Sequence, residues 1–189
     1  MSLSYRLLLI EDSADDAELL LYSLRDAPFK FAANRVETEL EYVAALTQEL
    51  PDVVLCDYNL PRFNADRALE ILHERKLDIP FIVVSHHIGE DAAVAAMQNG
   101  ASDYLLKNRL GRLPGVIEAA IERRVSRQQH AVAEQALRAS EAMKRGILNS
   151  LSTRIAVLNG KGVIVATNKA WDSYGDTRSQ SYKAPAELN

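Results

Sequence analysis

The 189-residue sequence predicts an α/β domain built on a parallel sheet, followed by a long helix and a small hairpin. Three observations carry this prediction. Short apolar runs alternate with amphipathic stretches over residues 7–106, as strands buried on both faces alternate with the helices that cover them. A long stretch nearly free of glycine and proline follows, which is typical of a helix. After it, two short apolar runs flank Asn159-Gly160, a strong hairpin signal.

Five strands are expected in the first part of the chain, with a helix between each pair. The strands are predicted at residues 7–10, 31–36, 53–56, 81–84 and 104–106. The helices are predicted to begin after Ser13 and end before Pro28, to begin at the capping box Thr38–Glu41, and to cover residues 65–75 and 90–99. Alternation of this kind predicts a parallel sheet whose crossover connections are right-handed.

Local signals predict where three of these helices begin or end. Ser13 can cap the first helix with Asp16 three residues on, Thr38 and Glu41 form a capping box, and Gly100 can end the fourth helix. The second helix is expected to bury one side, formed by Leu40, Val43, Ala44 and Leu50.

Residues 114–150 are predicted to form one helix, in which Gly146 is the single glycine after Gly115. At 1.5 Å per residue, about 35 residues would reach roughly 50 Å, which is too long for the closing helix of a small domain. Apolar and polar positions at alternating spacings of four and three suggest a heptad seam: Ile121, Val125, Gln128, Val132, Gln135 and Ala139. Such a seam favours a homodimer in which two copies of the helix form a coiled coil. The alternative is a single amphipathic helix that packs on its own domain.

Composition and charge exclude several classes of protein. With 48% hydrophobic and 25% charged residues the chain has the balance of a globular protein. The apolar runs are too short to span a bilayer, and the start lacks a secretion signal, so we expect a soluble cytoplasmic protein without membrane contact. The single cysteine, Cys56, rules out an internal disulfide.

The formal net charge of −4 is unevenly distributed. Residues 1–113 hold 11 Lys+Arg against 19 Asp+Glu, and residues 114–189 hold 11 against 7. This change of sign suggests two modules with different roles. The arginines of the long helix have no aromatic platform or recognition helix beside them, so no nucleic-acid partner is expected.

Polar residues gather at the ends of the predicted strands. In parallel α/β sheets the functional crevice lies beyond the carboxyl ends of the strands. The residues expected there are Glu11, Asp12, Asp57, Ser85 and Lys107. Any one of them alone is more simply a polar strand end, but five in corresponding positions predict a site.

The chemistry of this set points to phosphoryl transfer. Carboxylates that lie close together repel one another and need a cation to stay ionised, and oxygen ligands suit Mg²⁺. A carboxylate such as Asp57 can act as a nucleophile and form an aspartyl-phosphate. A metal ion, Lys107 and the Ser85 hydroxyl could then neutralise the transferring group.

These segments resemble the receiver domain of two-component response regulators, and the resemblance covers about residues 5–125. The matching stretches are Leu8-Leu9-Ile10-Glu11-Asp12, Val53-Val54-Leu55-Cys56-Asp57-Tyr58-Asn59-Leu60-Pro61, Ile82-Val83-Val84-Ser85 and Gly100-Ala101-Ser102-Asp103-Tyr104-Leu105-Leu106-Lys107. The resemblance implies a flavodoxin-like, doubly wound fold with five parallel strands.

The resemblance also implies a role for each site residue. Asp57 would accept a phosphoryl group from a histidine kinase or a histidine phosphotransfer protein. Asp12, Asp57 and the backbone carbonyl of Asn59 would bind Mg²⁺, with Glu11 acting through water. Lys107 would pair with Asp57 and later with the phosphoryl group, and Ser85 and Tyr104 would form the switch pair.

Two features depart from the family pattern. The family often has proline after the strand-end lysine, with a cis peptide, whereas this chain has Lys107-Asn108. A non-proline cis bond costs about 3 kcal/mol, so trans geometry or an altered loop is expected. Glu11 stands where aspartate is more usual, and its longer side chain suits a contact through water equally well.

Residues 151–189 resemble the opening of a PAS sensory domain. The resemblance is carried by residues 155–171, while residues 179–185 offer no further core. We therefore expect a partial segment without a complete pocket, either disordered or packed against a partner chain. The predicted organisation is therefore a receiver core at 1–113, a linker helix at 114–150 and a PAS-like segment at 151–189.

The predicted function is a phosphoacceptor that relays a signal through the linker helix to a downstream sensory or output module. Enzymatic activity is not expected beyond Mg²⁺-dependent phosphorylation and dephosphorylation of Asp57. The main alternative is a phosphorylation-independent interaction module that dimerises through the helix. An aspartyl phosphatase would have Asp-x-Asp where Glu11-Asp12-Ser13 stands, and the acidic loop that follows would repel the phosphate of a flavodoxin-type cofactor.

Overall fold

The computed structural model describes residues 3–58, 60–61, 63–86 and 90–176. The chain divides into two compact units, residues 1–128 and 129–189. We call them the N-terminal unit and the C-terminal unit and describe each by itself. They share one helix, α5 (Leu113–Ser150).

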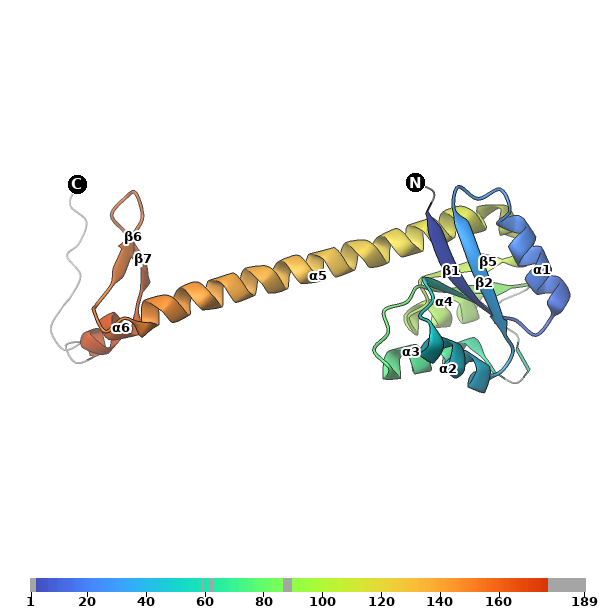
Figure 1. Cartoon of the computed structure of the whole chain (residues 1–189), viewed down its shortest axis with the longest axis horizontal. Helices are drawn as coiled ribbons and strands as arrows, with labels where there is room; N and C mark the ends of the chain where they lie inside the picture. The colour runs from blue at the N-terminus through green and yellow to red at the C-terminus, as the bar shows by residue number, and fades with distance from the viewer. Residues whose placement is uncertain (1–2, 59, 62, 87–89, 177–189) are drawn as a thin grey trace. The chain divides into compact units, whose positions relative to one another are not determined.

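The N-terminal unit (Figure 1) contains the predicted five-stranded parallel sheet. The strand order in this sheet is β2-β1-β3-β4-β5. The strands are β1 (Ser4–Ile10), β2 (Lys30–Val36), β3 (Val53–Asp57), β4 (Phe81–Ser85) and β5 (Asp103–Leu106). The connecting helices are α1 (Ala14–Ser23), α2 (Glu39–Gln48), α3 (Ala65–Glu74) and α4 (Glu90–Gln98). β2 lies on one side of β1, and β3, β4 and β5 follow on the other side, which makes the sheet doubly wound.

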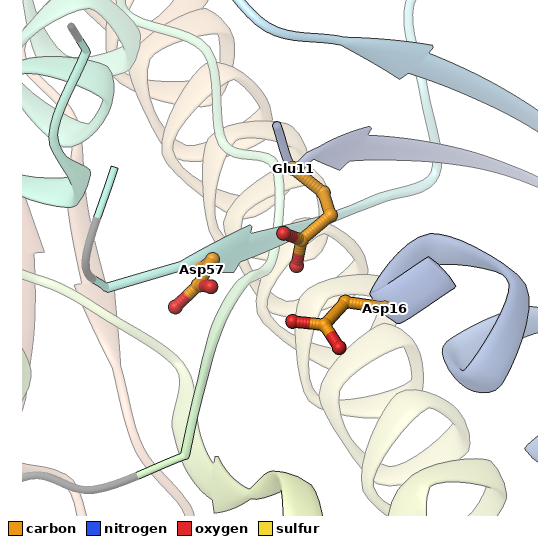
Figure 2. Close-up of side chains that lie close together, drawn as sticks. All are labelled: Glu11, Asp16 and Asp57. Atoms are coloured by element: carbon orange, nitrogen blue, oxygen red, sulfur yellow. The ribbon is translucent and has the colours of Figure 1, made fainter. Parts of the chain in front are cut away.

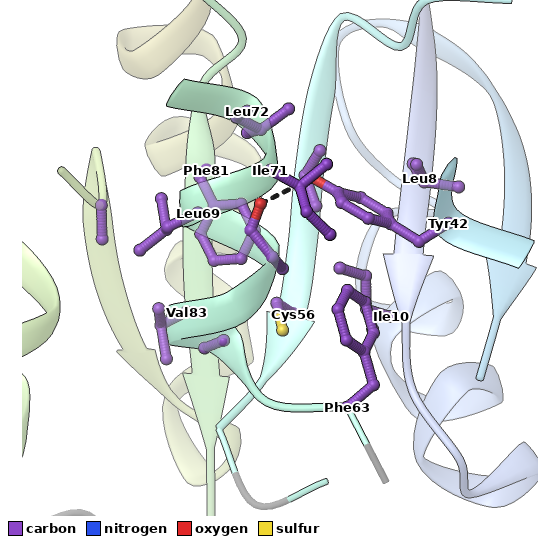
Figure 3. Packing of buried hydrophobic residues seen from close by; sticks show 14 of the residues in the cluster. Leu8, Ile10, Tyr42, Cys56, Phe63, Leu69, Ile71, Leu72, Phe81 and Val83 are labelled. Carbon is purple, nitrogen blue, oxygen red and sulfur yellow. Dashed lines mark hydrogen bonds between the residues drawn. The ribbon is translucent and has the colours of Figure 1, made fainter. Parts of the chain in front are cut away.

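Helices cover both faces of this sheet because its central strands are apolar on both sides. Along β1, Leu8 and Ile10 belong to one hydrophobic core and Leu7 and Leu9 to the other, as the two-residue period of a strand requires. The first core packs under α2 and α3 and includes Tyr42, whose hydroxyl donates to the carbonyl of Ala68 at 3.3 Å (Figure 3). The second core packs under α1 and the first turns of α5.

The predicted caps are present. The Ser13 hydroxyl accepts from the backbone N–H of Asp16 at 3.2 Å, and both hydrogen bonds of the Thr38–Glu41 capping box are formed. Gly100 ends the turn after α4 with φ of +103°, where a Cβ would lie 2.9 Å from Nε2 of His73. Glycine is therefore required at this position.

The predicted buried side of the second helix was right only in part, since Val43 is partly buried against the first core. Leu40 is 80% exposed and Leu50 lies beyond the helix, while Tyr42 and Leu46 are buried. Tyr42 and Leu46 are one helical turn apart and place larger apolar surface against the sheet, so α2 is rotated to bury them.

The segment after β5 follows the expected trans geometry. No described peptide bond is cis. A 3₁₀ helix, Lys107–Arg112, leads from the sheet into α5.

Helix α5 begins one residue before the predicted start. Leu113, Val116, Ile117, Ala120 and Ile121 are buried in the second core. Ile121, predicted as the first residue of the heptad seam, therefore packs on its own unit. Farther along the helix Val125 and Val132 are exposed.

In the C-terminal unit the predicted hairpin is formed by the antiparallel strands β6 (Ala156–Leu158) and β7 (Ile164–Thr167), followed by α6 (Lys169–Asp176). The side chain of Asn159 accepts from the backbone N–H groups of Lys161 and Val163, and Gly162 adopts φ of +77°. The predicted tail at residues 179–185 lies outside the described residues. Among the described helices, none is both long enough and apolar enough to cross a bilayer.

Candidate functional site

The site lies at the carboxyl edge of the sheet, where the strand register aligns four chain segments. Ile10 pairs with Cys56, Asp57 with Val84, and Ser85 with Leu106. The strands therefore end at a similar level. Glu11 directly follows β1, and Lys107 directly follows β5. The topology thus gathers Glu11, Asp57, Ser85 and Lys107 at one edge, as the sequence predicts.

The Lys107 ammonium is the centre of the site. Its Nζ donates to Oε2 of Glu11 at 2.8 Å, to Oδ2 of Asp16 at 2.6 Å and to Oδ2 of Asp57 at 2.8 Å. An ammonium has three N–H donors, so these contacts use all of them. The Lys107 and Glu11 side chains are each only 1% exposed, and the Asp57 side chain is 9% exposed.

Three carboxylates face one another around this ammonium. Figure 2 shows Glu11, from the end of β1, Asp57, from the end of β3, and Asp16, from the start of α1, lying close together. We call these three residues the acidic cluster. One ligand oxygen from each lies within 4.8 Å of the others.

Burial and pairing act in opposite directions on the pKa values of the cluster. Burial raises the pKa of Glu11 above its usual value, and the hydrogen bond from Lys107 partly offsets this. The hydrogen bond from Lys107 lowers the pKa of the more exposed Asp16. Burial opposes the charge on Lys107, but hydrogen bonds to Asp16, Asp57 and Glu11 outweigh it and hold the pKa above its usual value.

Asp16 is a site residue that the sequence prediction did not include. Ser13 caps α1 through the N–H of Asp16, so the first turn of α1 starts beside the strand ends and carries this carboxylate into the site. Oδ2 of Asp16 also lies 3.0 Å from Nε2 of the exposed His86, just after β4. The signal in the sequence was this cap, which places the third helical residue close to β1.

Asp12 lies outside the acidic cluster, and its side chain is exposed. Its backbone carbonyl accepts from Nη1 of Arg35 at 3.3 Å. Successive side chains at a strand end point in opposite directions, which separates Asp12 from Glu11. Asn59, the other predicted metal ligand, lies outside the described residues, so its role and that of Asp12 stay predictions.

The predicted switch residues lie on neighbouring strands. Ser85 is fully buried, and Tyr104 is partly buried against the first core. Val83 pairs with Tyr104, so Ser85, two residues along β4, projects from the same face of the sheet as Tyr104. The Tyr104 hydroxyl is buried without a hydrogen-bond partner among the described residues, and burial raises its pKa.

The donor atoms of the site fit a magnesium ion. The cluster offers carboxylate oxygens only, and hard oxygen ligands are those that Mg²⁺ prefers. Three carboxylates with one ammonium leave two excess negative charges, which a divalent cation would balance. The site therefore has the charge and the ligand type for Mg²⁺.

Comparison with known proteins is consistent with this geometry. The chain is 31% identical over 99 residues to the regulatory protein LuxO of Vibrio cholerae, a match that covers 52% of this chain and 21% of LuxO. It is 36% identical over 90 residues to the DNA-binding transcriptional regulator NtrC of Salmonella typhimurium, which covers 47% and 19%. The match thus spans about a fifth of the length of these relatives.

The solved structures agree in fold. The signal receiver domain of a Luxo repressor protein from Vibrio parahaemolyticus superposes with a TM-score of 0.60 at 26% identity, over 67% of this chain and 97% of that domain. The sequence model of the response regulator receiver domain matches residues 7–118, more than half of the chain. The chain therefore belongs to the response regulator receiver family.

Proposed function

We propose that the N-terminal unit is a phosphoacceptor and that Asp57 is its phosphorylation site. The observation that carries the proposal is the Asp57 carboxylate at the end of β3, hydrogen-bonded to buried Lys107 at 2.8 Å beside two further carboxylates. The donor is a phosphohistidine on a histidine kinase or a phosphotransfer protein, as receiver-family membership implies. We place this exchange in the cytoplasm.

The transfer balances without any further reactant. An oxygen of Asp57 attacks phosphorus, the P–N bond to histidine breaks, and the histidine nitrogen keeps the electron pair. The product is an acyl phosphate, which water hydrolyses back to the carboxylate. Lys107 lies where it can donate to an oxygen of the phosphoryl group.

A magnesium ion would be held by Asp57 together with Glu11, Asp12 and the carbonyl of Asn59. When bound, it neutralises charge on the phosphoryl oxygens. Glu11 is already turned toward Asp57, whereas Asp12 would have to turn inward to reach the ion.

We further propose that Ser85 and Tyr104 report the phosphorylated state. The Ser85 hydroxyl would bind a phosphoryl oxygen, and Tyr104 would shift on the face that the two residues share. The unpartnered hydroxyl of Tyr104 supports this role, because a buried hydroxyl without a hydrogen bond gains from moving to a position where it has one.

Helix α5 is the proposed output element. Its first turns pack in the second core against residues of β4 and β5, the strands that carry the switch residues on their other face, so a shift of these strands would act on the helix. Val125 and Val132 are exposed beyond that anchor, and we propose that they form the start of a homodimer contact. The C-terminal unit would be the PAS-like module that receives the signal.

Nucleic-acid binding is not part of the proposal for this chain. NtrC is named a DNA-binding regulator, but the match covers only 19% of that protein.

The test is phosphorylation with a small acyl phosphate donor in the presence of Mg²⁺, read by intact-protein mass. Wild type should gain one phosphoryl group and Asp57→Asn none. Asp52→Asn, which removes a carboxylate outside the acidic cluster, should behave as wild type. No gain in wild type, together with no Mg²⁺-dependent binding of beryllofluoride, would identify a phosphorylation-independent interaction module instead.

A further inference from the structure

We infer that Asp16 is a positioning residue that restrains Lys107 before phosphorylation and opposes the charge of the phosphoryl group. The inference rests on the proposed function. Asp16 comes from helix α1, outside the strand ends that carry the other site residues.

The first observation is the contact between Asp16 and Lys107. Oδ2 of Asp16 lies 2.6 Å from Nζ, compared with 2.8 Å for the contacts from Glu11 and Asp57. Since all three N–H donors of Lys107 are in use, a new bond from Lys107 to a phosphoryl oxygen requires that one existing contact be weakened. The Asp16 side chain is 23% exposed, compared with 9% for Asp57 and 1% for Glu11. Water can therefore replace the hydrogen bond from Lys107 most easily at Asp16.

The second observation is the balance of charge. The acidic cluster and Lys107 together carry two excess negative charges, which one divalent cation would balance. Phosphorylation of Asp57 replaces a single negative charge by about two. The Asp16 carboxylate, within 4.8 Å of the Asp57 oxygen, then repels the phosphoryl group.

The same charge must act in opposite directions on two steps. It favours binding of Mg²⁺ to the unphosphorylated site, because it adds negative charge around the cation. It disfavours the phosphorylated site at saturating Mg²⁺, because the cation is already bound and the added charge is negative. If the role of Asp16 were purely structural, its substitution would lower both the affinity for Mg²⁺ and the rate of phosphorylation.

His86 supports the positioning of Asp16. Its Nε2 lies 3.0 Å from the same Oδ2 that accepts from Lys107, so the carboxylate is held between β4 and β5 as well as by its own helix. Asp16 thus has a defined position at the edge of the site.

The experiment compares Asp16→Asn with Asp15→Asn in the full chain. Asp15 is exposed in the same first turn of α1 and lies outside the acidic cluster, so its substitution removes the same charge from the helix N-terminus without touching Lys107. Two quantities are measured: the affinity for Mg²⁺ alone by calorimetry, and the rate of phosphorylation by a small acyl phosphate at saturating Mg²⁺.

Relative to Asp15→Asn, we expect Asp16→Asn to bind Mg²⁺ about threefold to tenfold more weakly and to be phosphorylated about threefold to tenfold faster. Asp16→Glu, which keeps the charge, should return both values toward wild type. Asp16→Ser repeats the test with a smaller neutral side chain if the asparagine variant does not fold.

Two results would overturn the inference while leaving phosphorylation of Asp57 intact. One is that Asp16→Asn matches Asp15→Asn in both measurements, and the other is that both quantities fall together. Failure of wild type to accept phosphate would instead count against the proposed function itself, so the two failures are distinguishable.

Discussion

The two units bury their apolar residues to very different degrees. In the N-terminal unit every residue of β3 and of β4 is buried. In the C-terminal unit Val157, Leu158, Val163, Ile164 and Val165 are all more than 40% exposed. Both regions have apolar runs at strand positions, so an apolar run indicates a strand but not whether that strand is covered.

The two units also bury different polar groups. The N-terminal unit buries an ammonium among carboxylates. In the described part of the C-terminal unit, the buried polar side chain is a neutral amide, Asn168, at 0% exposure. Nδ2 of Asn168 donates to the carbonyls of Leu148, Leu151 and Thr153, and Oδ1 accepts from the N–H groups of Ile155 and Trp171. A charged centre suits chemistry, whereas a saturated amide suits the joining of chain segments.

The largest expected effect follows from the difference in burial. Phe81→Ala, at a fully buried position of β4, should lower the free energy of unfolding by about 3–5 kcal/mol, because it leaves a cavity in the first core. Ile164→Ala, at a position that is 49% exposed in β7, should change it by less than about 1 kcal/mol. Urea unfolding followed by circular dichroism measures both, and equal losses would show that the hairpin is buried in solution.

A smaller, local effect is expected at Asn168. Asn168→Ala leaves several carbonyl and N–H groups of the C-terminal unit without partners, at a cost of about 1–3 kcal/mol to that unit. Limited proteolysis should then cut residues 151–168 faster, while the unfolding midpoint of the N-terminal unit stays unchanged. Lys161→Ala, at an exposed position in the hairpin turn, is the control, and equal cleavage of the two variants would argue against the junction role.

A helix cap of the N-terminal unit offers a comparison with Asn168, which also accepts from the first turn of α6. Thr38→Ala removes the hydroxyl of the capping box of α2 and should cost about 1 kcal/mol, measured by urea unfolding. Thr38→Ser should retain most of this stability. An alanine variant as stable as wild type would mean that the Glu41 side chain alone caps the helix.

The smallest expected effect is a change in how steeply the free energy of unfolding varies with pH. Burial raises the pKa of Glu11 in the folded protein above the ordinary value of about 4.5 that it has in the unfolded chain. Between the unfolded-state pKa and the higher folded-state pKa, the folded protein therefore binds more protons than the unfolded chain. The contribution of Glu11 to stability is therefore present at low pH and is lost as the pH rises through that window. Glu11→Gln should make the free energy of unfolding, measured with a chelator present, fall less steeply above pH 4.5 than in wild type. Glu18→Gln, at an exposed position of α1, should leave the slope unchanged, and parallel curves for all three proteins would contradict the burial effect.

Much of the candidate site was predictable because its residues follow strands. The register of a parallel sheet brings strand ends to one edge, so Glu11, Asp57, Ser85 and Lys107 could be assigned together from sequence position alone. Asp16 could not, since its place in the site depends on how α1 leaves β1. The sequence likewise did not show that Asp12, adjacent to Glu11, has an exposed side chain.

The sequence by itself determined the order of strands and helices, the capping box of α2, the turn at Gly100 and the family of the N-terminal unit. These depend on local propensity, side-chain periodicity and short motifs, all of which are encoded within a few neighbouring residues. Only the tertiary structure decided which side of α2 is buried, that Ile121 packs on its own unit, and that Asp16 shares Lys107 with Asp57. The physical reason is that burial and charge pairing depend on residues distant in the chain, whose positions are set by packing rather than by local sequence.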